Sequence, residues 1–321
     1  IVGRVGLDAD NQWTAISPMR LDVTTQQARS LAVGAPEHAL GWIFDPRGEP
    51  RVVSATREGV MRIYWRAPGR DAWDEIARMD PLNPFFAPRF VDATGKLYVT
   101  SAEGAAGYAV LKRFNFTTGK PERDALITVP GFDFQGTPII AQDAPDATLG
   151  FRIMTDGQTT IWLDERIKKL QQDVDARLPG RINRLACGKC GSDDIVALIY
   201  SYSDQDPGQY FVYRPSSKDW RIVGRVRPDI DPKRMATLEL HRMKARDGLE
   251  IPVWLTLPPG GNRNSARPAV VLVHGGPWVR GEWMHWNADA QFLASRGYVV
   301  IEPEFRASTG YGFRHFHAGW K

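Results

Sequence analysis

The chain has little cysteine, no long apolar run and no strong charge excess. Two cysteines in 321 residues are too few for a fold built on disulfides. No stretch approaches the roughly 18 consecutive apolar residues of a membrane span. The net charge is +4, from 41 basic and 37 acidic residues that are interspersed along the chain. Because the basic residues form no runs, the sequence argues against a nucleic-acid-binding protein.

Two further absences concern the start of the chain and its chemistry. The chain begins at Ile1 without a methionine, so the lack of a signal peptide leaves both a cytoplasmic and a periplasmic location open. No Gly-x-Ser-x-Gly motif occurs in it. A length of 321 residues and a hydrophobic content of 43% suit a globular protein of two domains.

Residues 1–235 predict short strands separated by turns. Asp45 and Asp92 each precede a glycine turn and an alternating strand, 47 positions apart. Less regular versions of this aspartate–turn–strand pattern follow near Asp156 and Asp194. A strand–turn–strand unit repeated every 40 to 50 residues is typical of β-propeller blades. We therefore expect part of a propeller in residues 1–235, and a β-sandwich is the alternative.

One segment of this region has helical rather than alternating periodicity. Apolar residues share one helical face between residues 163 and 178, and Pro179-Gly180 ends the pattern. They are Ile167, Leu170, Val174 and Leu178. This pattern predicts an inserted helix that packs on a blade.

Residues 236–321 change to an α/β pattern after the Pro228–Pro232 junction. Two strands meet at the turn-forming pair Asp247-Gly248. A strand at 269–273, a helix near 287–296 and a strand at 298–302 follow, and this order predicts a parallel strand pair. We expect the first part of an α/β-hydrolase domain here.

The most informative motif is His274-Gly275-Gly276-Pro277, which follows the strand at 269–273. Hydrolases that attack carbonyl groups need backbone N–H groups aimed at the oxygen that becomes negative in the transition state. Glycines let the backbone turn sharply and approach a substrate closely. We predict that these four residues form an oxyanion loop.

Four side chains near the second strand are candidates for a substrate pocket. They are Trp283, Glu302, Glu304 and Arg306. Ligands bind at the carboxyl ends of parallel strands, and the two glutamates would bind a substrate ammonium there. A solvated or ion-paired rim for the glutamates, a structural ion pair for Arg306 and helix packing for Trp283 are the alternatives.

The remaining metal-type residues predict no metal site. Cys187 and Cys190 have the spacing of half a zinc site, but no second pair lies nearby. A local disulfide between them stays open. His315 and His317 are two positions apart without a further ligand, so we expect both at the surface.

The motifs of residues 236–321 resemble the prolyl oligopeptidase family of serine peptidases, in its acylaminoacyl-peptidase and dipeptidyl-aminopeptidase branch. The resemblance rests on RDGLEIPVWLTLP, HGGPW and QFLASRGYVVIEPEFRASTGYG. The chain departs from the family pattern at Glu304, where asparagine is usual, and at Ala307, where glycine is usual. Residues 1–235 resemble the family only in their strand pattern.

The resemblance implies hydrolysis of short peptides without a cofactor, by a Ser–Asp–His triad expected after Lys321. The chain as given would then be inactive, and only residues 274–277 inherit a role. A carboxylesterase and a non-catalytic propeller that binds partners are the alternatives. Endo- or exopeptidase action, residue preference and oligomeric state stay open.

Overall fold

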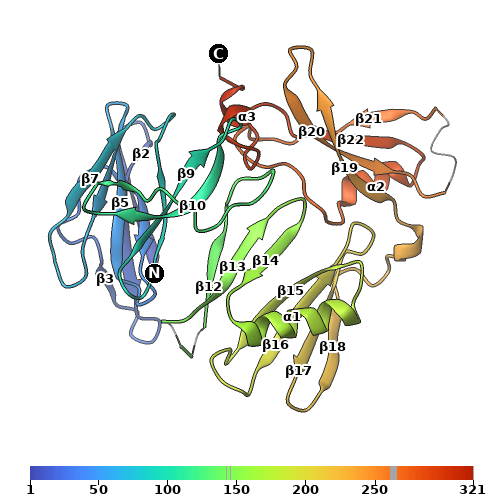
Figure 1. Cartoon of the computed structure of the whole chain (residues 1–321), viewed down its shortest axis with the longest axis horizontal. Coiled ribbons are helices and arrows are strands. Elements are labelled where there is room, and N and C mark those ends of the chain that lie inside the picture. The colour runs from blue at the N-terminus through green and yellow to red at the C-terminus, as the bar shows by residue number, and fades with distance from the viewer. Residues whose placement is uncertain (142, 145, 261–265, 321) are drawn as a thin grey trace. The chain divides into compact units, whose positions relative to one another are not determined.

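The computed structural model describes residues 1–141, 143–144, 146–260 and 266–320, and most of its regular structure is β-strand (Figure 1). The chain divides into two compact units. The first unit contains Ile1–Ala102, Val110–Thr128 and Pro145–Ala147. The second unit contains Glu103–Ala109, Val129–Ala144 and Thr148–Lys321.

The first unit consists of antiparallel sheets of three or four strands, each in chain order. Their strands are β1 (Val2–Leu7), β2 (Trp13–Leu21) and β3 (Ala28–Ser30); β4 (Ala39–Phe44), β5 (Pro50–Arg57), β6 (Val60–Trp65) and β7 (Asp74–Met79); and β8 (Ala87–Val91), β9 (Leu97–Glu103), β10 (Tyr108–Asn115) and β11 (Lys120–Pro121). Alternating side chains of β5, β6, β9 and β10 bury a common core that includes Val52, Ile63, Trp65, Leu97 and Phe114.

The repeated Asp–Gly turns have the same geometry in two of these sheets. Asp45 lies between β4 and β5, and its carboxylate accepts the N–H groups of Arg47 and Glu49, each at 3.0 Å. Asp92 lies between β8 and β9 and accepts the N–H groups of Thr94 and Lys96, each at 2.9 Å. The sequence repeat therefore corresponds to a structural repeat, in which an aspartate closes the first hairpin of a four-stranded sheet.

The second unit begins with two further antiparallel sheets. Their strands are β12 (Thr137–Ile140), β13 (Thr148–Met154) and β14 (Gln158–Trp162), then β15 (Ile182–Gly188), β16 (Val196–Tyr202), β17 (Gln209–Arg214) and β18 (Asp219–Arg225). The predicted helix is confirmed as α1 (Glu165–Arg177), which Asp164 caps at its N-terminus. Ile167, Leu170 and Val174 are buried in one core with residues of β15 and β16 (Figure 1).

The last sheet of the second unit is mixed, in the order β19-β20-β22-β21. Its elements are β19 (Thr237–Lys244), β20 (Glu250–Leu257), β21 (Ala269–Val271), α2 (Ala288–Ala294) and β22 (Val299–Pro303), after a short 3₁₀ turn at Pro232–Arg234. β21 and β22 are parallel, with Val270 opposite Val300. The predicted parallel pair with a helix between its strands is confirmed, although β21 is shorter than the predicted strand.

The hairpin before this pair also follows the prediction. β19 and β20 are antiparallel, and a turn around Asp247-Gly248 joins them. The Gly248 N–H donates to the Ala245 carbonyl at 2.8 Å, and Gly248 has φ +83°, which favours glycine. The structure thus contains open sheets of three or four strands with few helices, and a domain boundary at residue 235 stays a prediction.

Two expectations about individual residues change with the structure. Cys187 and Cys190 form a disulfide, the alternative that the sequence left open. His315 is not at the surface: it is buried in the short helix α3 (Phe313–His317), where its Nε2 lies 3.0 Å from the Phe305 carbonyl. His317 is exposed, as expected. Within the described ranges, no helix is long and apolar enough to cross a membrane.

Candidate active site

The candidate site lies where the parallel strands β21 and β22 end. The Leu272 N–H donates to the Ile301 carbonyl at 2.9 Å, so the two segments stay paired just beyond β21. The carboxyl ends of parallel strands lie at the same sheet edge. This edge brings His274 together with Glu302 and Glu304, which line a cavity of about 180 Å³.

His274 is fixed on three sides. Its ring stacks on Phe305, with a centroid distance of 4.2 Å and an interplanar angle of 16°. Its Nδ1 lies 2.8 Å from the Gly275 carbonyl, and its Nε2 lies 3.0 Å from the Ser308 hydroxyl. A carbonyl can only accept, so a neutral ring carries its proton on Nδ1 and accepts the Ser308 proton on Nε2.

This arrangement orients the peptide between the two glycines. The carbonyl and the N–H of one peptide plane point in opposite directions, so binding of the Gly275 carbonyl by His274 turns the Gly276 N–H away from the ring. Gly275 and Gly276 are both exposed. Within the described part of the chain, neither glycine N–H donates a hydrogen bond. Both amides are therefore available to an external acceptor.

The two glycines differ in what they require. Gly276 has φ +139°, and a Cβ there would lie 2.9 Å from Cγ2 of Val279. A Cβ on Gly275 would meet nothing within 4 Å. The backbone therefore needs glycine at position 276, whereas position 275 would accommodate a small side chain.

Glu304, which directly follows β22, binds the backbone of Gly281 and Glu282, a few residues beyond the glycine pair. Its side chain is 0% exposed. Its carboxylate accepts the Gly281 N–H at 3.1 Å and the Glu282 N–H at 2.6 Å, and lies 3.7 Å from Nε2 of His274. Burial raises the pKa of Glu304, and these two hydrogen bonds act in the opposite direction. Both ends of the segment 274–282 thus contact one buried carboxylate.

Glu302 lies beside a second buried acid, Glu282. Burial, and next the negative charge of Glu282, raise the pKa of Glu302 to about 8. Burial also disfavours the charged form of Glu282, but hydrogen bonds from His285 and Asn287 outweigh it and lower the pKa of Glu282. Asn287 Nδ2 lies 2.8 Å from Glu282 and 3.2 Å from Glu302. Near neutral pH the proton of this pair resides on Glu302.

The other two predicted pocket residues lie outside this cavity. Arg306 forms a bidentate ion pair with Asp247, with both N–O distances at 2.8 Å. Trp283 stacks on His285 at a centroid distance of 4.5 Å. The pair to Asp247 also lowers the pKa of that carboxyl to about 2, through the hydrogen bonds from Arg306.

Sequence reasoning missed Ser308 and Gly281. Ser308 is fully buried against His274, and a Cβ on Gly281 would overlap the His274 ring. Ser308 belongs to the segment 304–312, whose Ser-Thr-Gly stretch was the available signal. Gly281 had no such signal, because its need for glycine arises from a ring seven residues earlier. Among the described residues, no group of His, Cys, Asp or Glu is arranged to hold a metal ion.

Comparison with known proteins finds relatives by sequence and by structure. No family model matches the chain. Over 324 aligned residues it is 31% identical to dipeptidyl aminopeptidase BIII of Pseudoxanthomonas mexicana, covering 97% of this chain and 45% of that protein. The chain is a homologue of dipeptidyl aminopeptidases. It spans about half the length of this relative.

Solved peptidase structures share the fold of this chain. A prolyl endopeptidase matches with a TM-score of 0.60 and 14% identity, over 99% of this chain and 48% of its own. A puromycin hydrolase matches with a TM-score of 0.59 and 19% identity, over 92% of this chain and 45% of its own. At these identities the two structures show a shared fold, and together with the homology to dipeptidyl aminopeptidases they confirm the predicted resemblance to the prolyl oligopeptidase family.

Proposed function

We propose that the protein containing this chain is a serine peptidase that hydrolyses short peptides by acyl transfer. Its homologues are dipeptidyl aminopeptidases. We also propose that the antiparallel sheets before residue 236 are blades of a propeller and that the mixed sheet opens an α/β-hydrolase domain. The matched Asp45 and Asp92 turns and the parallel pair of β21 and β22 support this architecture.

The exposed amides of Gly275 and Gly276 are the observation that carries the proposal. An N–H without a protein acceptor at a sheet edge stabilises an oxygen that gains negative charge. His274 holds the Gly275 carbonyl and thereby fixes the direction of the Gly276 amide before substrate binds. This pre-organisation avoids a reorganisation cost during the reaction.

The proposed reaction has two steps. A serine, activated by a histidine and an aspartate that would follow Lys321, attacks the peptide carbonyl. The carbonyl oxygen becomes negative and is stabilised by an amide of the loop, while the amine departs with a proton from the histidine. Water then hydrolyses the acyl-enzyme. The residues described here supply the oxyanion loop and its support.

The decisive experiment changes Gly275 in the full-length protein. Gly275→Pro removes one N–H, and losing one oxyanion donor costs about 3 kcal/mol in the barrier. We expect kcat for an aminoacyl-nitroanilide to fall by about a hundredfold or more, with little change in KM. Gly275→Ala is the matched control, because it keeps the N–H and its Cβ enters open space, so its kcat should stay close to wild type.

The outcomes separate the three functions. Unchanged turnover in Gly275→Pro would exclude the Gly275 amide as the oxyanion donor and leave only the Gly276 amide, which His274 orients. Hydrolysis of p-nitrophenyl esters without any hydrolysis of nitroanilides by the wild-type protein would favour a carboxylesterase. Hydrolysis of neither substrate would favour a non-catalytic binding module.

A further inference from the structure

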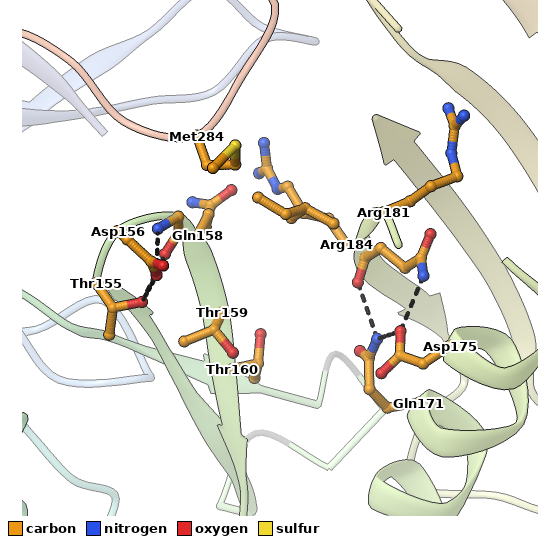
Figure 2. A pocket seen from close by; sticks show the side chains of 13 residues that line it. Thr155, Asp156, Gln158, Thr159, Thr160, Gln171, Asp175, Arg181, Arg184 and Met284 are labelled. Carbon is orange, nitrogen blue, oxygen red and sulfur yellow. Dashed lines mark hydrogen bonds between the residues drawn. The ribbon is translucent and has the colours of Figure 1, made fainter. Parts of the chain in front are cut away.

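A polar pocket of about 430 Å³ lies within the second unit, at the β13–β14 turn, α1 and β15 (Figure 2). Its lining includes the hydroxyls of Thr155, Thr159 and Thr160, the Gln158 amide and the guanidinium of Arg184. Figure 2 shows the Arg184 side chain directed towards Gln158 and Met284, and the Arg181 side chain directed away from them. The pocket is separate from the cavity at His274.

Arg184, which lines this pocket, and Arg152, which bonds to the next residue Leu185, both lack a counter-charge among the described residues. Nε of Arg184 and Nε of Arg152 are buried without a hydrogen-bond partner. Arg152 Nη2 donates to the Leu185 carbonyl at 2.6 Å, next to Arg184 in the chain. In the described part of the chain, neither arginine forms an ion pair with a carboxylate. Burial, and next the positive charge of Arg184, lower the pKa of Arg152.

The acids near the pocket are already engaged. Asp175 accepts hydrogen bonds from Gln171 and Asn183, both at 2.9 Å (Figure 2). Asp156 accepts from the Thr155 hydroxyl and from the Gly157 N–H, both at 2.9 Å. Both acids are satisfied by neutral donors, so neither serves as the counter-ion of Arg184.

Arg181, the other arginine in the lining, is also engaged. It forms an ion pair with Asp206 at 2.8 Å and a hydrogen bond to Ser201 at 2.7 Å. Arg184 is therefore the arginine of this pocket whose charge has no partner among the described residues.

The pocket is joined to the segment that follows the candidate oxyanion loop. The Met284 N–H donates to the Asp156 carbonyl at 2.7 Å, and the Arg280 guanidinium donates to the Thr155 carbonyl. Met284 itself lines the pocket. Since the segment 274–286 carries both contacts and the glycine amides, a ligand in this pocket lies against the segment that positions the reacting carbonyl.

We propose that Arg184, supported by Arg152, binds a carboxylate group of the peptide substrate in this pocket. A guanidinium binds a carboxylate through two parallel N–H···O bonds. Nε of Arg184 is buried, so the donors towards the pocket are its two Nη groups, for which no described residue provides an acceptor. The hydroxyls of Thr159 and Thr160 and the Gln158 amide supply further donors. The inference rests on the proposed peptidase function, and the carboxylate would be either the C-terminus of the peptide or an acidic side chain.

The test uses the full-length protein and matched pairs of short peptides. One pair carries a C-terminal carboxylate or carboxamide, and the other carries glutamate or glutamine at the same position. Charge-assisted hydrogen bonds favour the acid by roughly tenfold or more in affinity. We expect Arg184→Met to abolish this preference through KM and Arg184→Lys to retain part of it. Arg221→Met, an exposed arginine on β18, should leave the preference intact.

The results are separable from failure of the proposed function. If the wild-type protein cleaves none of the peptides, the function fails, and dissociation constants of the same peptides from calorimetry replace KM. Loss of the C-terminal preference identifies a C-terminal carboxylate, and loss of the glutamate preference identifies a side chain. Unchanged preferences in Arg184→Met overturn the proposal. If Arg184→Met lowers the melting temperature and leaves the preferences unchanged, Arg184 has a structural role instead, and the proposal is also overturned.

Discussion

Two groups of buried charge in the second unit differ in what satisfies them. At the end of β22, Glu304 is bound by two backbone N–H groups of the chain itself. Across β13 and β15, Arg152 and Arg184 keep buried N–H groups that nothing in the described chain accepts. Buried polar groups are almost always satisfied, so the first group fixes the shape of a loop and the second points to an external ligand.

The same distinction separates the two glutamates of the edge. Glu304 is surrounded by donors, whereas Glu302 lies against another acid and becomes neutral. Burial raises the pKa of both, but only Glu304 holds two backbone N–H groups, so the two carboxyls should respond differently to the same isosteric change.

Glu304→Gln should have the largest effect on stability. The amide oxygen can still accept one of the two backbone N–H groups, but its NH₂ group would face the other, which is then buried without a partner. Such a group costs about 2 kcal/mol. We expect the free energy of unfolding to fall by about that amount in urea titrations followed by tryptophan fluorescence, with a lower kcat because the loop loses its anchor.

The control for Glu304→Gln is Glu302→Gln, which changes the same atoms two residues earlier. Glu302 is largely neutral in the folded protein, so its amide analogue should be tolerated. Equal destabilisation by both substitutions would show that the two backbone bonds of Glu304 have no special role, and the distinction between the glutamates would be lost.

The second prediction concerns the pH dependence that Glu302 contributes. Its pKa of about 8 in the folded protein exceeds its ordinary value of 4.5. Between these values the unfolded chain releases the proton and the folded chain keeps it, so stability falls as pH rises, by up to about 1.4 kcal/mol per pH unit, and then levels off. The stability difference between wild type and Glu302→Gln, measured from pH 5 to 9, should follow this curve.

In that series the substituted protein should be the more stable one at about pH 8, because it lacks a carboxyl that must either stay protonated or charge in a buried site. His285 also has a raised pKa: burial acts to lower it, but Glu282 and the charge of Glu302 raise it, so its titration changes with the substitution and adds to the difference. A difference that does not change with pH would mean that Glu302 is ionised in the folded protein.

Local sequence patterns predicted several elements of the second unit. The periodicity of Ile167, Leu170, Val174 and Leu178 predicted α1; the first three are buried, and Leu178 is the partly buried C-cap. The order of strand, helix and strand predicted the parallel pair of β21 and β22. Each element is predicted from a dozen or fewer consecutive residues, because hydrogen bonding and burial of one face follow the local repeat, and the parallel pairing follows from the order of three such elements.

The hydrogen-bond and ion-pair partners of the charged side chains could not be predicted in the same way. Glu304 accepts hydrogen bonds from Glu282 and Gly281, which lie 22 and 23 positions earlier in the chain, and Arg306 pairs with Asp247, 59 positions away. Arg184 looks like any other strand arginine in the sequence, and the missing partner is visible only once β13, α1 and β15 lie together. His315 was misplaced for a related reason: its burial depends on the Phe305 carbonyl, ten residues away.

The smallest predicted effect tests whether Ala307, three residues after Glu304, is held in an unfavourable backbone conformation. Ala307 is buried and has φ +77°, a left-handed conformation that disfavours residues with a Cβ by roughly 1–2 kcal/mol. Ala307→Gly relieves this cost but loses a buried methyl group and increases the freedom of the unfolded chain, so the net change in unfolding free energy should be within about 0.5 kcal/mol of zero. Ala294→Gly removes the same methyl group from α2, where the backbone is helical and Ala294 is 1% exposed, and should lower stability by about 1 kcal/mol or more. Because the two changes delete the same atoms, their difference in urea titrations isolates the backbone contribution. Equal losses at both positions would show that Ala307 is unstrained, and that the glycine usual there in related proteins has another cause.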